Sequence, residues 1–476
     1  MKLKSLLLCA LLAVGLGGCS IGPDYERPMM DMPDTWQSGS ADPGTVINDN
    51  WWRMFNDETL NQLVEEALAY NQDLVLAMAR VDEARARLGM ARSDQLPAVD
   101  MPGGFSRQSP STYSPTYVPG GNREINAWNF GGLLSFEIDL WGKYRRASES
   151  AVASLLSSQA ARDTVRLTLI SDVVDGYYSL RALDLQVQIA EDTLASRKAG
   201  EALYRLRFEE GDADEMTYRQ AQAESRATET SLRQYQNLRA AGENSLAVLL
   251  GRSPRDIIGK PVARGTAVNM VNLPLLVPGG LASDLLNRRP DIWQAEQELR
   301  AATANIGVAK AALLPSFSLT GFLGFESVEF NNLFNKNAAT WSWGGNMSMP
   351  LLNLSVWYGW GVAEAQQRQA LASYMKTVQT AYAETQSALL NNRKAREILL
   401  ARFSQVGALR RALELAQLRY DNGYSDYLEV LDTQRSLFAA ELSLADDYKN
   451  QLSAVNQLCR ALGGGWAGAE KLQPSQ

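Results

Sequence analysis

The sequence predicts a mixed α/β protein that is mainly α, built from a duplicated unit of helix, β-hairpin and long helical hairpin. Three observations carry this prediction. Short motifs recur at a constant spacing, each half holds two stretches in which apolar and polar residues alternate, and each half continues into a long stretch without proline. A repeat of this length is well above that of solenoid proteins, so it predicts two pseudo-equivalent halves around an axis.

The duplication is visible in pairs of motifs. Residues 71–74 (Asn-Gln-Asp-Leu) correspond to 289–292 (Arg-Pro-Asp-Ile), a spacing of 218 residues. Residues 249–251 (Leu-Leu-Gly) correspond to 461–463 (Ala-Leu-Gly), a spacing of 212. We therefore predict a signal peptide (1–18), a lipid-anchored extended segment (19–57) and a first repeat (58–252). A linker (253–280), a second repeat (281–466) and a C-terminal tail (467–476) follow.

The first residues are typical of a bacterial export signal. Lys2 and Lys4 precede an apolar run, and small residues then lead to Cys19. This pattern resembles a lipobox, in which Cys19 is acylated and becomes the mature N-terminus. The alternative is an ordinary secretory peptide with an incidental cysteine. Residues 19–57 are rich in proline and glycine, and we expect them to tether the lipid to the body as an extended segment.

The first repeat is predicted to begin with a helix and to continue into strands. Asp57 is placed to cap the helix, which is expected to run to about Gln95. Four strands are predicted, at about 97–106, 127–140, 315–325 and 341–352. A period of two over about ten residues is what a tilted strand needs to cross a bilayer, but a half-buried periplasmic sheet alternates identically. Four strands are too few to close a membrane barrel, so a membrane role requires several copies of the chain.

Long helical hairpins are predicted after each pair of strands. Arg145 to Phe208 is 64 residues, which as one helix would extend roughly 96 Å. That length exceeds a globular core and implies a coiled coil or a barrel of helices. Gly211 and Gly423 interrupt the pattern at matching places, where we predict tight reversals that use the positive φ of glycine.

The composition argues against an enzyme. The chain has no histidine and three cysteines, which removes the histidine-based nucleophile arrangements and zinc sites, so no cofactor or metal site is predicted. A net charge of −7 without a basic stripe argues against a nucleic-acid partner. Behind the signal, no apolar run is long enough to predict a transmembrane helix.

The order of elements behind a lipid anchor resembles the TolC and OprM family of outer-membrane efflux channels, in particular its NodT-like lipoprotein members. Four stretches carry the resemblance: Arg-Arg-Pro-Asp-Ile at 288–292, Ala-Asn-Ile-Gly at 304–307 with Leu-Pro-Ser at 314–316, Tyr-Leu-Glu-Val-Leu-Asp at 427–432, and Ala-Leu-Gly-Gly-Gly-Trp at 461–466. The resemblance implies a homotrimer with a twelve-stranded outer-membrane β-barrel on a periplasmic α-helical barrel. It further implies a passive exit duct for drugs or other small molecules in a Gram-negative bacterium, surrounded by outer-membrane lipid. The implied partners are a periplasmic adaptor and an inner-membrane RND-type pump.

The resemblance also implies a periplasmic gate in the second hairpin. Carried over by motif, its residues are Leu428, Glu429, Asp432 and Arg435. Their counterparts 212 residues earlier are uncharged: Met216, Thr217, Gln220 and Ala223. This asymmetry is what a gate confined to one hairpin would leave. The alternative is that Asp432 and Arg435 form an ordinary surface pair three residues apart on a helix.

Family members contact the adaptor through the hairpin tips. By resemblance these are Arg207, Phe208 and Gly211 in the first half and Arg419, Tyr420 and Gly423 in the second. The alternative is two turns with solvent-exposed charges. For the whole chain, other interpretations remain open: a structural coiled-coil lipoprotein without a pore, an adaptor protein, an exit duct for metal ions or secreted proteins, and a hydrolase that uses only carboxylates.

Overall fold

The structure, a computed structural model, describes residues 20–32, 49–113, 124–271 and 285–466. These residues divide into two units. The strand unit comprises the described parts of 1–29, 81–158 and 295–375. The hairpin unit comprises those of 30–80, 159–294 and 376–476.

The strand unit contains one antiparallel sheet of order β1-β3-β4-β5, in which β2 also pairs with β3. The strands are β1 (Ala98–Asp100), β2 (Gly103–Gln108), β3 (Ile125–Ile138), β4 (Ser316–Ser327) and β5 (Ala339–Ser348). The strand expected at 97–106 is interrupted, because Pro102 has no N–H for the ladder and its carbonyl instead accepts a hydrogen bond from Gly131 N (3.2 Å). The strand expected at 341–352 ends at Ser348, ahead of Pro350.

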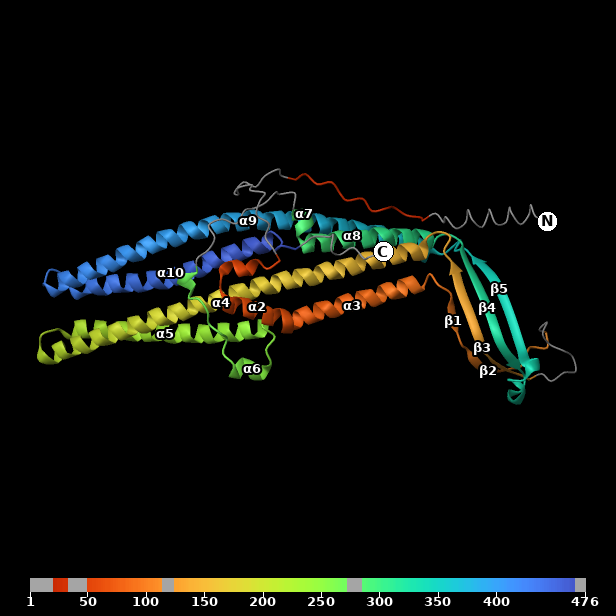
Figure 1. Cartoon of the computed structure of the whole chain (residues 1–476), viewed down its shortest axis with the longest axis horizontal. Coiled ribbons are helices and arrows are strands. Elements are labelled where there is room, and N and C mark those ends of the chain that lie inside the picture. The colour runs from red at the N-terminus through yellow and green to blue at the C-terminus, as the bar shows by residue number, and fades with distance from the viewer. Residues whose placement is uncertain (1–19, 33–48, 114–123, 272–284, 467–476) are drawn as a thin grey trace. The chain divides into compact units, whose positions relative to one another are not determined.

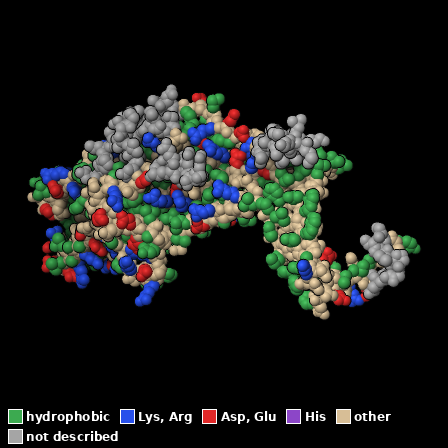
Figure 2. All heavy atoms as spheres, turned by 45° about the vertical axis from the view of Figure 1, so that its right-hand side comes forward, with side chains coloured by type: hydrophobic (Ala, Val, Ile, Leu, Met, Phe, Trp, Pro, Cys, Tyr) green, Lys and Arg blue, Asp and Glu red, His purple; other side chains and the backbone are tan. Residues whose placement is uncertain are grey.

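The two faces of this sheet differ in polarity, as the alternation predicts. On one face, apolar side chains lie opposite one another across the strands: Phe130 and Phe325, Phe136 and Leu319, Leu323 and Trp341. On the other face the opposed pairs are mostly polar, as in Ser135 with Thr320 and Glu137 with Ser318. Figure 2 shows hydrophobic side chains gathered over the strands with few charged ones among them. β1 and β2 pair only with β3, and β5 pairs only with β4, so both outer edges of the described sheet keep unpaired backbone groups.

Residues 20–27, which we call the N-terminal strap, are held against the strand unit. Ile21 N donates to Trp141 O (3.1 Å), in the turn after β3. Ser20 lies against Gly142, where a Cβ would be 3.0 Å from the Ser20 Cα. Arg27 forms an ion pair with the fully buried Glu296 (2.5 Å). The segment expected to be a tether is therefore extended here but seated on the protein by specific contacts.

The duplicated unit is confirmed (Figure 1). The first half contains α2 (Glu58–Tyr70), α3 (Gln72–Ser93) and the helical hairpin of α4 (Lys143–Glu210) and α5 (Glu215–Leu249). The second half contains α7 (Leu285–Arg288), α8 (Pro290–Ala311) and the hairpin of α9 (Leu354–Asp421) and α10 (Tyr427–Ala461). Helices α4 and α9 have 68 residues each, and α5 and α10 have 35 each, so the two hairpins match in length. Among the described helices, none combines the length and apolar character needed to span a membrane.

The helix expected from Asp57 to about Gln95 is broken at Asn71. Asp57 caps α2 as predicted, since its side chain accepts bonds from the N–H groups of Thr59 and Leu60. Asn71 ends α2 and caps α3, because its Oδ1 accepts hydrogen bonds from Asp73 N and Leu74 N (2.9 and 3.1 Å). Asn71 can cap the next helix, so the chain can break there without any change in the helical periodicity of the sequence.

The recurring motifs contact each other, and we call this contact the joint of each half. In the first half Asn71 Nδ2 donates to Leu249 O (2.9 Å), and in the second half Arg289 Nη1 donates to Ala461 O (3.2 Å). A glycine closes each joint. A Cβ at Gly251 (φ +70°) would lie 2.1 Å from Tyr70 O, and one at Gly463 (φ +89°) would lie 2.0 Å from Arg288 O. The two motif pairs recur together because they build one contact in each half.

Two segments expected to be connections belong to the core of the hairpin unit. The short helix η1 (Trp51–Phe55), inside the expected extended segment, buries Trp51, Trp52 and Phe55. In the expected linker, α6 (Pro254–Gly259) precedes a stretch bound to α4 and α2. Arg181 donates to Gly265 O (3.2 Å) and Thr266 O (3.1 Å), and Thr266 N donates to Asp57 (3.1 Å). The proline-rich composition predicted a linker, whereas polar contacts fix the stretch around Gly265 and Thr266 in the hairpin unit.

Candidate functional site

The two hairpin tips turn in the same way. Gly211 and Gly423 have φ values of +81° and +75°. Equivalent backbone hydrogen bonds close the turns, from Asp212 N to Arg207 O (2.7 Å) and from Tyr424 N to Arg419 O (2.8 Å). A Cβ at either glycine would meet none of the described residues within 4 Å. Glycine is needed at the tips for its backbone conformation and not for space.

Three tyrosines join the two hairpins near their tips. Tyr204 of α4 packs against Tyr427 of α10 with ring centroids 4.2 Å apart, and Tyr420 packs against Tyr427 at 5.5 Å. Tyr204 is only 4% exposed. Burial, followed by the nearby Tyr420, raises the pKa of Tyr427 to about 12. Tyr427 is therefore uncharged at physiological pH, and the three rings hold the hairpins together by apolar contact.

The other predicted tip residues have separate surroundings. The Arg207 guanidinium lies 5.7 Å from the centre of the Tyr204 ring. Phe208 stacks on Tyr218 within its own hairpin, with centroids 6.0 Å apart. Arg419 forms an exposed ion pair with Glu429 (3.6 Å), which brings a predicted tip residue to a predicted gate residue. The exposed faces of both tips thus carry arginine and aromatic side chains.

The predicted gate residues do not form one cluster within a single copy of the chain. Leu428 is 56% exposed, and Asp432 is also exposed. Arg435 binds Glu224 on α5 of the first hairpin, with its Nε and Nη2 at 2.7 and 2.5 Å from Oε1. The hydrogen bond to Glu224 is the main reason that the pKa of Arg435 is raised, and Asp432 contributes only through its charge. The ion pair that the structure gives Arg435 is thus with Glu224 on the other hairpin.

Glu224 also binds Arg197, and we call Arg197, Glu224 and Arg435 the inter-hairpin triad. Arg197 Nη1 donates to Glu224 Oε2 (2.8 Å) and to Thr228 Oγ1 (2.6 Å). The side chains of Arg197 and Glu224 are 7% and 11% exposed, whereas that of Arg435 is 49% exposed. One nearly buried carboxylate thus holds a buried arginine of its own hairpin and a half-exposed arginine of the other hairpin.

Two of the three triad residues are missing from the sequence prediction. Neither residue lies at a position equivalent to one of the predicted gate residues of the second half, and Glu224 corresponds to the uncharged Ser436. A signal was present nonetheless. Arg197 precedes Gly211 by 14 residues and Glu224 follows it by 13, so a reversal at this glycine places them opposite each other on neighbouring helices.

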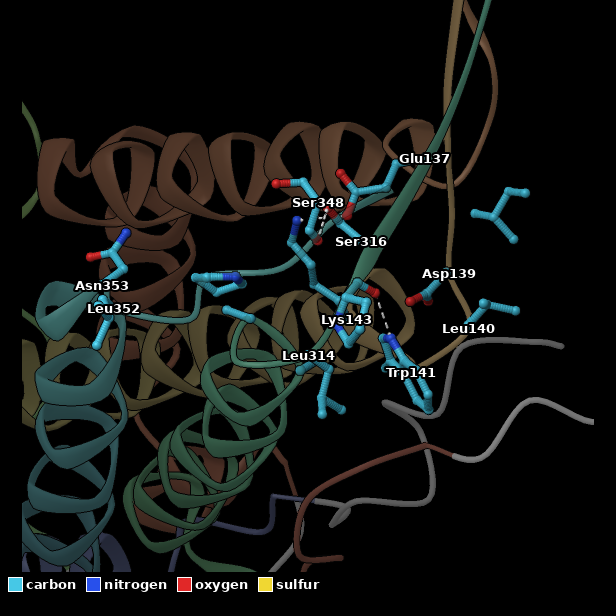
Figure 3. A pocket seen from close by; sticks show the side chains of 15 residues that line it. Glu137, Asp139, Leu140, Trp141, Lys143, Leu314, Ser316, Ser348, Leu352 and Asn353 are labelled. Carbon is cyan, nitrogen blue, oxygen red and sulfur yellow. Dashed lines mark hydrogen bonds and ion pairs between the residues drawn. The ribbon is translucent and has the colours of Figure 1, made fainter. Parts of the chain in front are cut away.

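A cavity of about 410 Å³ lies in the strand unit where the strands meet the helices. Figure 3 shows Glu137, Ser316 and Ser348 on one side of it and Trp141 on another. Lys143 Nζ donates to Glu137 (3.0 Å), and Trp141 Nε1 donates to Pro315 O (2.7 Å). The charges of Lys143 and Glu137 neutralise each other, so we assign no chemistry to this cavity.

Two further sequence predictions concern the lipidation of Cys19 and metal binding. Cys19, the predicted lipidation site, lies outside the described residues. Within the described ranges, no group of three or more cysteine, aspartate or glutamate residues could hold a metal ion.

The duplicated fold, with a two-faced sheet in one unit and paired helical hairpins in the other, defines the class of outer-membrane efflux channels. The chain matches the family model described as outer membrane efflux protein over residues 63–252 and 281–464. The chain belongs to this family, and it is an outer-membrane component of an efflux system.

Known relatives and solved structures match over almost the whole chain. The sequence is 36% identical to the toluene efflux pump outer membrane protein TtgC of Pseudomonas putida over 471 residues, 97% of this chain and 96% of the relative. It is 32% identical to the cation efflux system protein CusC of Escherichia coli over 467 residues, 97% and 98% of the two chains. The crystal structure of the Campylobacter jejuni CmeC outer membrane channel is similar with a TM-score of 0.90 at 28% identity, covering 95% of this chain and 96% of that one.

Proposed function

We propose that three copies of this chain assemble into the passive exit duct of a tripartite efflux system. The observation that supports this best is the sheet, which has one apolar face, one mostly polar face and, among the described residues, two unpaired edges. A face of apolar side chains suits lipid, and a polar face suits a water-filled lumen. Pairing β5 of one copy with β1 and β2 of the next would satisfy every edge and close the sheet.

Conductance in planar lipid bilayers tests this proposal. Purified protein is expected to cross-link as a trimer and to produce discrete current steps, because a closed sheet with a polar inner face conducts ions. A protein that inserts or binds without current steps would instead support the alternative of a structural lipoprotein without a pore.

The proposed partners follow from the hairpin tips and from the predicted lipidation site. We propose that the hairpin tips, with Arg207, Phe208, Gly211, Arg419, Tyr420 and Gly423, contact a periplasmic adaptor that links the duct to an inner-membrane RND-type pump. Both tips carry arginine and aromatic side chains, of which Phe208 and Arg419 are exposed, and such side chains are enriched in protein interfaces. Acylation of Cys19 would anchor each copy in outer-membrane lipid. We propose small organic molecules as cargo, as in the name of TtgC.

We also propose that Leu428, Glu429, Asp432 and Arg435 belong to the periplasmic gate. The contact that supports this is the ion pair of Arg435 with Glu224, which ties the second hairpin to the first (2.5 Å). An outward movement of the second hairpin would have to break this pair. Because Glu224 is nearly buried and Arg435 half exposed, the pair is stronger than an ordinary surface ion pair.

Replacing Arg435 by methionine is expected to open the gate. The variant loses the ion pair between the hairpins but leaves Glu224 paired with Arg197, so it is expected to fold. Single channels should open on the order of tenfold more often, as for the loss of an interaction worth about 1.4 kcal/mol. Cells carrying the variant should admit a large hydrophilic antibiotic that wild-type cells exclude. Unchanged opening and unchanged antibiotic entry would contradict the gate proposal while leaving the duct proposal intact.

A further inference from the structure

The two oxygens of Glu224 are divided between two arginines with different freedom to move. Arg435 binds Oε1 and Arg197 binds Oε2. Arg435 is 49% exposed, so it can move into water without losing hydration. Arg197 is 7% exposed, and its guanidinium lies 5.4 Å from the centre of the Phe438 ring. Only Arg435 is placed to leave the carboxylate.

Arg197 has donors that the triad does not use. Its Nη1 makes the contacts to Glu224 and Thr228, whereas its Nε and Nη2 are buried without a hydrogen-bond partner among the described residues. A guanidinium presents five N–H donors in a planar fork that fits both oxygens of a carboxylate. Burial is the main cause of a lowered pKa for Arg197, but an arginine stays protonated in proteins. Arg197 therefore remains a cation with spare donors beside Glu224.

We infer that Arg197 is the positioning residue that keeps Glu224 paired when Arg435 leaves, and that it thereby sets how readily the gate opens. In the closed arrangement each arginine takes one oxygen. Once Arg435 withdraws, Oε1 becomes free and the unused Nη2 of Arg197 takes it, so that a single-oxygen contact becomes a two-oxygen fork. This inference rests on the proposed gate and assigns it a part that the second-half gate residues do not supply.

The physical reason is the cost of an unpaired buried charge. Removing one partner from a buried ion pair is strongly unfavourable because the remaining charge has lost its hydration. With Arg197 present, the Glu224 carboxylate has two cationic partners before opening and keeps one of them, Arg197, after Arg435 has left. Without Arg197, the carboxylate has no cationic partner once Arg435 has left. Arg435 thus favours the closed state, whereas Arg197 lowers the free-energy cost of opening.

The test compares two single substitutions whose effects should have opposite signs. Arg435→Met is expected to raise the frequency of single-channel openings, whereas Arg197→Met is expected to lower it about tenfold or more and to slow export by cells that carry the whole efflux system. Combining Arg197→Met with Glu224→Gln removes the charge that needs a partner, so openings should return. The control is Arg205→Met, because Arg205 is 65% exposed and its ion pair is with Glu209 of its own helix.

The outcomes separate this inference from the gate proposal. More frequent openings in both Arg197→Met and Arg435→Met would overturn it, because Arg197 would then only strengthen the closed state. An Arg197→Met channel that opens like the wild type, with a normal amount of protein in the outer membrane, would overturn it as well. If Arg435→Met changes nothing, the gate proposal fails and this inference fails with it.

Discussion

Replacing Gly463 by alanine is expected to prevent the second half from folding and to leave little protein in the outer membrane. The new Cβ would lie 2.0 Å from Arg288 O, at a φ of +89°. The left-handed conformation alone costs a non-glycine residue about 1–2 kcal/mol. The clash is with backbone, so the joint itself would have to move, and we expect a total of more than about 4 kcal/mol. Thermal unfolding in detergent, followed by circular dichroism, measures the loss.

Three further alanine substitutions make this a graded series. Gly251→Ala tests the equivalent joint and should be as severe, since its Cβ would lie 2.1 Å from Tyr70 O. Gly423→Ala has the positive φ but no neighbour within 4 Å in the described part of the chain, so only about 1–2 kcal/mol is expected. Gly407 lies inside α9, and a Cβ there would have no neighbour within 4 Å among the residues that the structure describes. Gly407→Ala should therefore be neutral or stabilising by up to about 1 kcal/mol. If Gly463→Ala unfolded no earlier than Gly423→Ala, the joint would not be rigid.

Replacing Arg27 and Arg300 together by methionine is expected to release the N-terminal strap and to destabilise the strand unit. Glu296 is fully buried and lies 2.5 Å from Arg27 and 3.1 Å from Arg300. The Tyr25 hydroxyl donates to the same carboxylate (3.2 Å). Without the two cations the carboxylate is buried and uncompensated, at a cost of about 3–5 kcal/mol. Protease cleavage within residues 20–27, together with thermal unfolding, measures both effects.

The matched control is Glu296→Gln, which removes the anion instead of the cations. Arg27 and Arg300 are 39% and 40% exposed, so both can regain hydration when the carboxylate is gone. This substitution should therefore destabilise the protein much less than the double arginine variant. A greater loss in Glu296→Gln than in the double variant would mean that the unpaired buried carboxylate is not the main cost of removing these ion pairs.

The sequence predicted the duplicated fold because periodicity is a local property and because the constant spacing of the repeated motifs can be read directly from the sequence. The turns at Gly211 and Gly423 and the cap at Asp57 follow from the same kind of signal. The joints could not be predicted, although both motifs of each pair are visible in the sequence. About 180 residues separate Asn71 from Leu249, and no sequence pattern indicates that the two residues are in contact. The seat of the strap on Glu296 was hidden for a related reason, since an extended segment has no periodicity that identifies the face it binds.

The gate was predicted only in part. The family motif identified Arg435, but its partner lies on the other hairpin at a position that is uncharged in the second half. A comparison of equivalent positions cannot find a contact between non-equivalent ones. The burial that makes Glu224 a strong partner is a property of the packed hairpins and has no local signature in the sequence.

The open edges of the sheet also affect how a newly exported chain behaves before it assembles with other copies. In the described part of a single copy, the strand edges beside the apolar face are unpaired, and such edges pair readily with any other exposed strand. Productive assembly and aggregation are then competing encounters that both accelerate with concentration. We expect the yield on overproduction to depend on how many chaperones in the periplasm shield waiting copies, and much less on how stable the finished channel is.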